Sequence, residues 1–292
     1  MSDNWLDAFD ALTADDENHE ARETIIRAPW SYPGNKEYEL EHILKHLPQT
    51  SMYIEVFGGT GITLLNRKPS KLEVFNDRNS GITAMYMCMY DQRLLAQLCE
   101  RLRYVCHSRE LFVWSRDTWQ DCTDTVERAA RWYYSIQSSF IKKGKYFGRS
   151  TNPKTAFAPS LQPELELWWD IHQRIYPTVQ IENASWQRLF KDYNHVDAVW
   201  YLDPPYYGSN DIYQCEMADK EHVELLDKIQ DLKGFVALSG YPNELYKTYP
   251  WDEVHTWPRT TKANALASTD TNNNQDQKRV QVTEALWIRH PK

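Results

Sequence analysis

Short apolar runs rich in β-branched and aromatic residues recur along the chain, and they predict strands. These runs lie at residues 53–57, 72–75, 179–181, 199–202, 235–238 and 285–288. Several of them scarcely alternate between apolar and polar positions, which is typical of strands that helices cover on both faces. The pattern therefore predicts an α/β fold with a doubly wound, mostly parallel sheet.

Segments with apolar residues at helical spacing fill the gaps between these runs. They predict helices over residues 39–47, 80–102, 126–140 and 221–232. Residues 106–177 contain no strong strand and interleave basic with aromatic residues, so we expect an inserted helical subdomain there. The polar run at residues 268–277 predicts an exposed loop between the last two strands.

These patterns divide the 292 residues into three parts. Residues 1–24 lack a long apolar face and form an acidic, flexible N-terminal extension in this interpretation. Residues 25–105 and 178–292 form the α/β body, and residues 106–177 form the insertion. Hydrophobic residues at 41% and charged residues at 25% are ordinary for a globular domain, which excludes a collagen, a coiled coil and a wholly disordered chain.

Several sequence features bear on the cellular setting. No apolar run approaches the roughly 20 residues that a membrane span needs, and the acidic start is unlike a signal peptide. The five cysteines include no C-x-x-C pair, so neither a disulfide framework nor a zinc ribbon is indicated. We expect a cytoplasmic protein that needs neither a membrane nor a metal ion.

The net charge of −8 argues at first against a nucleic-acid partner, because phosphate binding draws on Lys and Arg. The charge is unevenly distributed, however. Residues 1–24 hold eight acidic residues and one basic residue, whereas residues 126–155 hold seven basic residues and one acidic residue. The seven basic residues predicted to bind phosphates are Arg128, Arg131, Lys142, Lys143, Lys145, Arg149 and Lys154. A solvated helix face is the alternative explanation of this basic block.

A glycine-rich turn follows the first predicted strand, at residues 58–61, and a short helical stretch follows the turn. Backbone amides in such a turn can face a ligand. Asp77 ends the second strand twenty residues after Phe57, where an acid typically accepts hydrogen bonds from ribose hydroxyls. The glycines do not spell G-x-G-x-x-G, which favours an adenosine site over a pyrophosphate clamp. A merely tight strand-to-helix turn remains possible at this stage.

The sequence Asp203-Pro204-Pro205-Tyr206 closes the fourth predicted strand. Prolines can simply end a strand, and an Asp can cap a turn. The end of a central strand is also where an open α/β sheet binds its ligand. A carboxylate and a neighbouring carbonyl there suit an amino group with two hydrogens, and Tyr206 offers a flat face for a planar ring.

These motifs together resemble those of the Dam-type (D12 class) DNA adenine-N6 methyltransferases, particularly the variants of phages and prophages. The glycine turn resembles the methyl-donor motif of that family, and residues 203–206 its catalytic DPPY. Residues 32–36 look like its upstream aromatic-x-Gly-x-Lys element. The 146 residues between Phe57 and Asp203 match the alpha group, whose target-recognition domain is inserted between the two motifs.

The resemblance implies a Rossmann-like fold, S-adenosylmethionine as the cofactor, and N6 of a flipped adenine in double-stranded DNA as the substrate. The residues implied to bind the cofactor are Tyr32, Pro33, Gly34, Lys36, Glu55, Phe57, Gly59, Gly61, Asp77, Ser185, Trp186 and Asp203. Ser185 stands where an Asp is common in the family. The implied catalytic group is Asp203, Pro204, Pro205 and Tyr206, with Tyr206 stacking on the target base and the insertion reading the DNA.

Other functions remain open from the sequence. An amino methyltransferase acting on RNA or on a glutamine side chain shares the chemistry, although glutamine enzymes tend to have Asn before the prolines and N4-cytosine enzymes more often have Ser. A catalytically idle DNA-binding regulator is a different class of alternative. The recognition sequence, a paired restriction endonuclease, and the choice between a monomer and a homodimer on a palindromic site are not determined.

Overall fold

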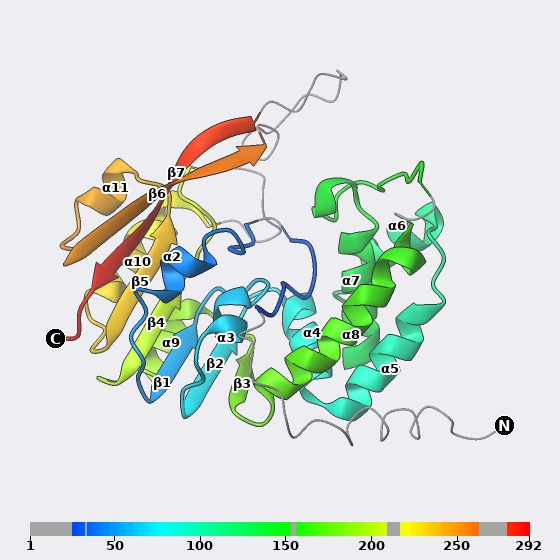
Figure 1. Ribbon diagram of the computed structural model, residues 1–292, viewed down its shortest axis with the longest axis horizontal. Coiled ribbons are helices and arrows are strands. Elements are labelled where there is room, and N and C mark those ends of the chain that lie inside the picture. The colour runs from blue at the N-terminus through cyan, green and yellow to red at the C-terminus, as the bar shows by residue number, and fades with distance from the viewer. Residues whose placement is uncertain (1–24, 33, 153–155, 209–216, 263–278) are drawn as a thin grey trace.

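The computed structural model describes residues 25–32, 34–152, 156–208, 217–262 and 279–292 (Figure 1). The expectations for residues 1–24, for Pro33, for Lys154 and for the loop at 268–277 lie outside the described residues. The strands are β1 (Met52–Glu55), β2 (Leu72–Asn76), β3 (Val179–Glu182), β4 (Ala198–Leu202), β5 (Phe235–Gly240), β6 (Glu253–Lys262) and β7 (Arg279–Arg289). The α-helices are α2 (Leu40–Leu44), α3 (Ile62–Asn66), α4 (Ser80–Tyr90), α5 (Gln92–Arg103), α6 (Arg109–Thr118), α7 (Thr125–Gln137), α8 (Phe157–Ile175), α9 (Trp186–Asp192), α10 (Asp219–Ile229) and α11 (Glu244–Lys247).

The described strands form one seven-stranded sheet in the order β3-β2-β1-β4-β5-β7-β6. Strands β1 to β5 pair in parallel, and β7 runs antiparallel to both β5 and β6. The order of the first five strands is that of doubly wound nucleotide-binding folds. The predicted mostly parallel, doubly wound sheet is therefore confirmed.

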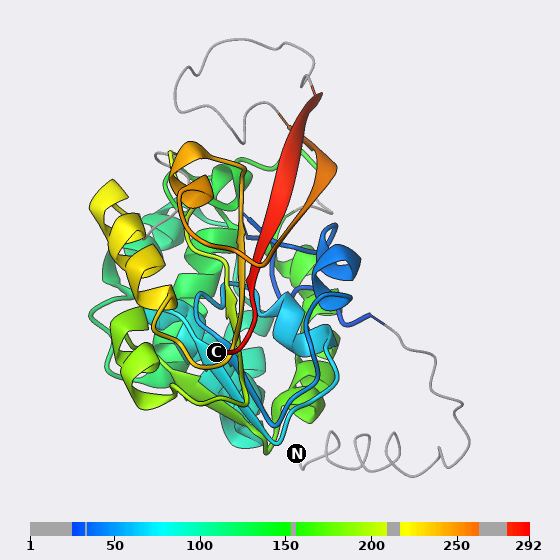
Figure 2. The same ribbon diagram turned by 90° about the vertical axis from the view of Figure 1, so that its left-hand side faces the viewer.

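Two apolar cores lie on opposite faces of this sheet, which explains the unalternating strands. In β4, Val199 and Tyr201 enter the core shared with α4, α5, α7 and α8. Trp200 and Leu202 point the other way, into the core shared with α9 and α10. Figure 2 views the sheet nearly edge-on, with α10 on one side and α2 on the other. Because both faces are buried, every position of β4 has to be apolar.

All six predicted strands are present, but the sequence did not predict β6. This strand is largely polar and contains Pro258, which cannot donate a ladder hydrogen bond. In the described sheet β6 lies at the edge and pairs only with β7, where one unused donor position is tolerated. The long, partly apolar β7 supplies the partner that makes this strand possible.

The single helix predicted over residues 80–102 is wrong, because the structure has two helices there. Asp91 lies between α4 and α5 in an extended conformation. Its carboxylate accepts hydrogen bonds from the amides of Arg93, at 2.8 Å, and Leu94, at 3.3 Å. An Asp in this position caps a new helix, so the apolar periodicity continues across a break in the backbone.

The helices between residues 106 and 177 pack directly against the α/β body. Helix α7 contacts α4 and α5, and α8 contacts α3, α4 and α5. Trp132 of α7 and Trp168 of α8 belong to the same apolar cluster as Phe75 of β2. In Figure 1, α4 to α8 form one group of helices beside the sheet. The target-recognition role of this segment stays a prediction.

A buried carboxylate ties α8 to the sheet. Glu73 of β2 is fully buried and accepts hydrogen bonds from Arg174 of α8, at 2.7 Å and 3.1 Å, and from Arg67, at 3.1 Å. Arg174 also donates to the carbonyl of Leu64 in α3. Paired charges of this kind add little net stability, but removing Arg174 would leave the buried charge of Glu73 with Arg67 as its remaining cationic partner.

We therefore expect Arg174→Ala to lower the free energy of unfolding by about 3 kcal/mol, because Glu73 loses two charge-assisted hydrogen bonds. Urea denaturation followed by circular dichroism measures the change. Arg188→Ala is the matched control, since Arg188 pairs with Asp192 at an exposed site and its loss should cost far less. Equal losses in the two variants would show that the buried cluster does not anchor α8.

Candidate functional site

A cavity of about 280 Å³ lies beyond the carboxyl ends of β1, β2, β3 and β4. The sheet order changes direction between β1 and β4, and such a point is where open α/β sheets bind ligands. The cavity brings together predicted site residues from five separate stretches of sequence. Those that line it are Tyr32, Gly34, Lys36, Glu55, Phe57, Gly59, Asp77, Ser185, Trp186, Asp203 and Pro205.

The glycine turn after β1 forms one wall. Gly59 has a φ of 54° and Gly61 a φ of 67°, which favour glycine at both positions. A Cβ on Gly59 would meet nothing within 4 Å, whereas one on Gly61 would lie 1.9 Å from the hydroxyl of Tyr86. Gly59 therefore borders the cavity, and Gly61 packs against the core at the start of α3. Gly61 is not among the residues that line the cavity, so its contact with the cofactor stays a prediction.

Asp77 closes the same wall from the end of β2. Its carboxylate accepts hydrogen bonds from the amide of Gly59, at 2.8 Å, and from the amide of Asn79, at 2.7 Å. Burial raises the pKa of Asp77 to about 6, although these two hydrogen bonds oppose the rise. Asp77 thus holds the glycine turn in place while it lines the cavity where ribose hydroxyls were predicted.

Glu55, at the end of β1, is a buried acid in the cavity wall. One of its oxygens accepts hydrogen bonds from the hydroxyl of Tyr53 and from the amide of Leu64, both at 2.8 Å. Burial raises the pKa of Glu55 to about 8, more than these hydrogen bonds lower it. The carboxyl group therefore carries its proton at neutral pH for much of the time, and it anchors the first turn of α3.

Lys36 and Asp203 form the centre of the site. The Lys36 Nζ atom lies 2.6 Å from Asp203 Oδ2 and 2.9 Å from the carbonyl oxygen of Gly34. It also lies 4.9 Å from the centre of the Tyr206 ring. Lys36 is 3% exposed, so its ammonium group is buried beside its partner. Burial raises the pKa of Asp203, and the ammonium group of Lys36 opposes that rise.

Behind this pair, Tyr206 joins a buried network that the sequence did not reveal. Its hydroxyl donates to Glu284 of β7 at 2.7 Å, and its ring meets that of Tyr241 edge-on at 4.5 Å. Arg259 of β6 lies between Glu284, at 2.8 Å, and Glu39, at 2.9 Å. Tyr206 is 7% exposed and does not line the cavity, so its stacking on a target base stays a prediction.

Two further residues that line the cavity, Asn76 and Thr60, were not predicted from the sequence. Asn76 donates to the carbonyl of Val56 at 2.7 Å and accepts from the amide of Ala184 at 2.9 Å, which links β1, β2 and the loop after β3. The hydroxyl of Thr60 donates to Asn35 at 3.2 Å and joins the glycine turn to the N-terminal segment. The one feature of the sequence that could have pointed to Asn76 as a site residue is its position directly before Asp77.

The loop after β3 supplies the aromatic wall. The hydroxyl of Ser185 accepts a hydrogen bond from the amide of Arg188 and caps α9. Trp186 follows it, 7% exposed, with its ring edge-on to Phe190 at 5.2 Å. Serine is a favoured residue at such a cap, so Ser185 has a structural role at the start of α9.

Comparison with models of protein families identifies the family to which these motifs belong. The model of the D12 class N6 adenine-specific DNA methyltransferases matches residues 32–260, which include every motif described above. The chain belongs to this family. It is accordingly a methyltransferase that uses S-adenosylmethionine, and the family match over most of the chain confirms the D12 resemblance.

The chain was also compared with curated proteins and with solved structures. No curated protein matches it in sequence. Among solved structures, the rRNA methyltransferase aviRa from Streptomyces viridochromogenes shares 11% identity at a TM-score of 0.39, covering 92% of this chain and 90% of that one. Precorrin 8w decarboxylase from Methanobacterium thermoautotrophicum shares 12% identity at a TM-score of 0.35, covering 91% and 96%.

The cavity of this D12 methyltransferase suits the parts of S-adenosylmethionine. Tyr32, Phe57 and Trp186 offer aromatic faces for an adenine ring, and Asp77 lies at the end of β2 for the ribose. Lys36 and Gly34 also line the cavity, and the buried ammonium group of Lys36 is a possible partner for a carboxylate. Asp203, whose carboxylate form the Lys36 ammonium group favours, also lines the cavity and could offer a negative charge to a positively charged sulfonium.

Three of the seven basic residues predicted to bind DNA make internal contacts. Arg128 donates to the carbonyl of Cys122, and Arg131 pairs with Glu127 at 3.0 Å. Lys142 donates to the carbonyl of the last residue of α7, and burial lowers its pKa. These contacts stabilise the helices around α7, so part of the basic block has a structural role.

The remaining described basic residues lie on the segment after α7. Lys145 and Arg149 are exposed and Lys143 is half-buried, on a loop that follows Phe140.

Among the helices that the structure describes, none is long and apolar enough to cross a membrane.

Glu55 gives a pH-dependent prediction. Its pKa of about 8 in the folded protein exceeds the ordinary value of 4.5, so the folded state binds one more proton than the unfolded state between these values. This proton makes the free energy of unfolding fall by about 1.4 kcal/mol per pH unit as the pH rises from 5 to 8. In Glu55→Gln this contribution is absent.

Urea denaturation of both proteins at pH 5.5 and pH 7.5 tests the point. The variant should become more stable relative to the wild type by about 2–3 kcal/mol between the two pH values. Parallel pH profiles would show that Glu55 titrates at its ordinary value. Other titrating groups contribute to both proteins and cancel in the comparison.

Proposed function

We propose that this D12 methyltransferase transfers a methyl group to N6 of an adenine in double-stranded DNA. One atom carries the proposal. The Oδ1 atom of Asp203 is buried and has no hydrogen-bond partner among the described residues, while Oδ2 pairs with Lys36. A buried carboxylate oxygen is costly to leave unpaired, and Asp203 borders the cofactor cavity. An amino group bound there would satisfy the orphan acceptor.

The chemistry of adenine explains why such an acceptor is needed. The N6 lone pair is delocalised into the ring, so N6 is a weak nucleophile. Hydrogen bonds from the two N6 hydrogens to Asp203 and to the carbonyl of Pro204 would favour a tetrahedral nitrogen with a localised lone pair. Bound S-adenosylmethionine would supply an electrophilic methyl group on its sulfonium sulfur.

Lys36 has a defined part in this proposal. Burial alone favours a protonated Asp203, which would be a poor acceptor for an N–H group. The Lys36 ammonium group, 2.6 Å away, favours the carboxylate and fixes its orientation. Methyl transfer leaves a positive charge on N6, and the carboxylate of Asp203 is placed to take the surplus proton.

The segment after α7 is the proposed DNA contact. The amide of Phe140 donates a hydrogen bond to the carbonyl of Tyr146 at 2.7 Å. The amide of Gly148 donates one to the carbonyl of Ser138 at 2.8 Å. These two hydrogen bonds close the loop into a narrow hairpin. Phe140, Ile141 and Tyr146 are 60%, 50% and 72% exposed. Apolar side chains on a basic loop suit contact with bases in a duplex, and the target adenine must leave the stack to reach Asp203.

The first test concerns Asp203. We expect Asp203→Ala to lower the rate of methyl transfer at least about a hundredfold, because the orphan acceptor is lost. Purified enzyme is incubated with unmethylated genomic DNA and S-adenosylmethionine, and the digested nucleosides are chromatographed. Sequencing of the modified DNA supplies the target site.

Two controls accompany this measurement. S-adenosylmethionine binding and circular dichroism of the variant show whether the fold and the cofactor site are intact. Near-normal turnover by Asp203→Ala would refute the mechanism. Methylation of an RNA of the same sequence, with none on the DNA duplex, would identify the RNA methyltransferase alternative instead.

The second test concerns the loop. Charge reversal at Lys143 and Lys145 should weaken DNA binding and reduce the slope of log K against log salt by about 0.9 for each lost phosphate contact. Fluorescence anisotropy with a labelled duplex at several salt concentrations measures both quantities. Lys228→Glu, on the exposed side of α10, is the matched control. Unchanged binding by the double variant would place the DNA interface elsewhere.

A further inference from the structure

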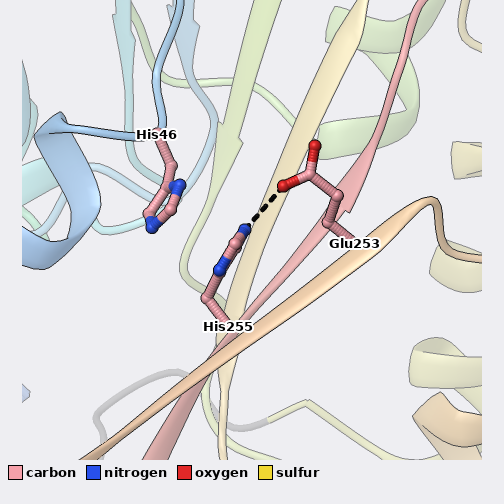
Figure 3. A group of neighbouring side chains, drawn as sticks. All are labelled: His46, Glu253 and His255. Atoms are coloured by element: carbon pink, nitrogen blue, oxygen red, sulfur yellow. Dashed lines mark hydrogen bonds and ion pairs between the residues drawn. The ribbon is translucent and has the colours of Figure 1, made fainter.

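A second cluster of functional side chains lies at the amino end of β6, in a part of the sheet remote from the cofactor cavity. It consists of His46, from the turn after α2, and Glu253 and His255, from β6 (Figure 3). The Nε2 atom of His255 lies 2.7 Å from Glu253 Oε2. The rings of His46 and His255 stack with their centres 3.7 Å apart.

The fold places these residues together by packing α2 along β6. Glu253 and His255 are two positions apart on the strand, so their side chains share one face. The same face carries a ladder of contacts with the N-terminal segment. His255 meets His46, Trp257 stacks on His42 at 4.9 Å, and Arg259 pairs with Glu39 at 2.9 Å; the last pair belongs to the network behind Asp203.

We propose that His46, Glu253 and His255 bind a divalent transition-metal ion, of which Zn²⁺ is the representative. Two imidazole nitrogens and a carboxylate oxygen are ligands that Zn²⁺ prefers. One potential ligand atom from each residue lies within 4.8 Å of the others. Bond lengths of about 2.0–2.2 Å put neighbouring ligands of a tetrahedral ion about 3.4 Å apart. Because the rings of His46 and His255 are stacked, one of them has to turn before both nitrogen lone pairs reach the same ion.

The surroundings of the three side chains suit an ion with an open coordination position. His290 lies 2.8 Å from the other oxygen of Glu253, so it can orient the carboxylate while Oε2 binds the metal. The side chains of His255 and Glu253 are 33% and 42% exposed, which leaves a path for the ion and room for a water ligand.

The competing explanation is a hydrogen-bonded chain without a metal. In that case Glu253 accepts from both His255 and His290, and His46 merely stacks on one of them. The negative charge of Glu253 distinguishes a metal site from a hydrogen-bonded chain. Glu253→Gln keeps a side chain of the same shape that can still hydrogen-bond, but it removes the negative charge that a cation requires.

The test uses the full-length chain, freed of any affinity tag and dialysed against a chelator. Titration with ZnCl₂ in competition with a chromophoric chelator gives the stoichiometry and the dissociation constant, and CoCl₂ absorption reports tetrahedral coordination. The ligand variants are His46→Ala, His255→Ala and Glu253→Gln. The matched control is His195→Ala, because His195 is another histidine beside a carboxylate, 3.8 Å from Asp197 on the surface.

We expect one zinc ion per chain in the wild type and in the control, and a dissociation constant raised at least about tenfold in each ligand variant. Zinc should raise the melting temperature of the wild type but not that of the variants, while metal-free Glu253→Gln should melt as the wild type does. Zinc binding that His46→Ala and His255→Ala leave unchanged would overturn the proposal, as would a wild type with no stoichiometric binding. Metal-free melting curves identify any variant that fails to fold.

Discussion

The ion pair between Lys36 and Asp203 joins two segments that are 167 residues apart, and the arrangement of the candidate site depends on it. Each charge would be costly to bury alone, so the pair forms only where the N-terminal segment, β4 and β7 meet. Tyr206, Glu284, Arg259 and Glu39 continue the network from this point through the interior. The position of the acceptor at the cavity is therefore set by several distant parts of the chain.

The doubly covered sheet makes this arrangement possible. Parallel strands buried on both faces bring their carboxyl ends to one edge, where Glu55, Asp77 and Asp203 follow consecutive neighbours in the sheet. The helices on one face are held by apolar packing and by the buried contacts of Arg174 with Glu73. These helices also carry the exposed hairpin after α7, so the proposed DNA contact and the cofactor cavity belong to one packed unit.

Strand β6 links two sites of different chemistry. Its central Arg259 stabilises Glu284 and Glu39 behind the Lys36–Asp203 pair, and its first residues form the histidine–glutamate cluster with His46. The same ladder of side chains between β6 and α2 spans both. An ion at the cluster would hold α2 to β6 at one end, while Glu39 and Arg259 hold them at the other.

The sequence by itself determined the sheet, the glycine turn, and the residues at the strand ends. Unalternating apolar runs and the residues that interrupt them act locally, so six strands and the cavity-lining positions Asp77 and Asp203 could be predicted. The break at Asp91 and the edge strand β6 escaped because a cap and a proline override periodicity. Only the tertiary structure decided which polar side chains meet: Lys36 with Asp203, Arg259 with Glu284, and His46 with His255. Such pairs form between segments remote in sequence, and no local pattern records them because burial and distance arise only when the chain has packed.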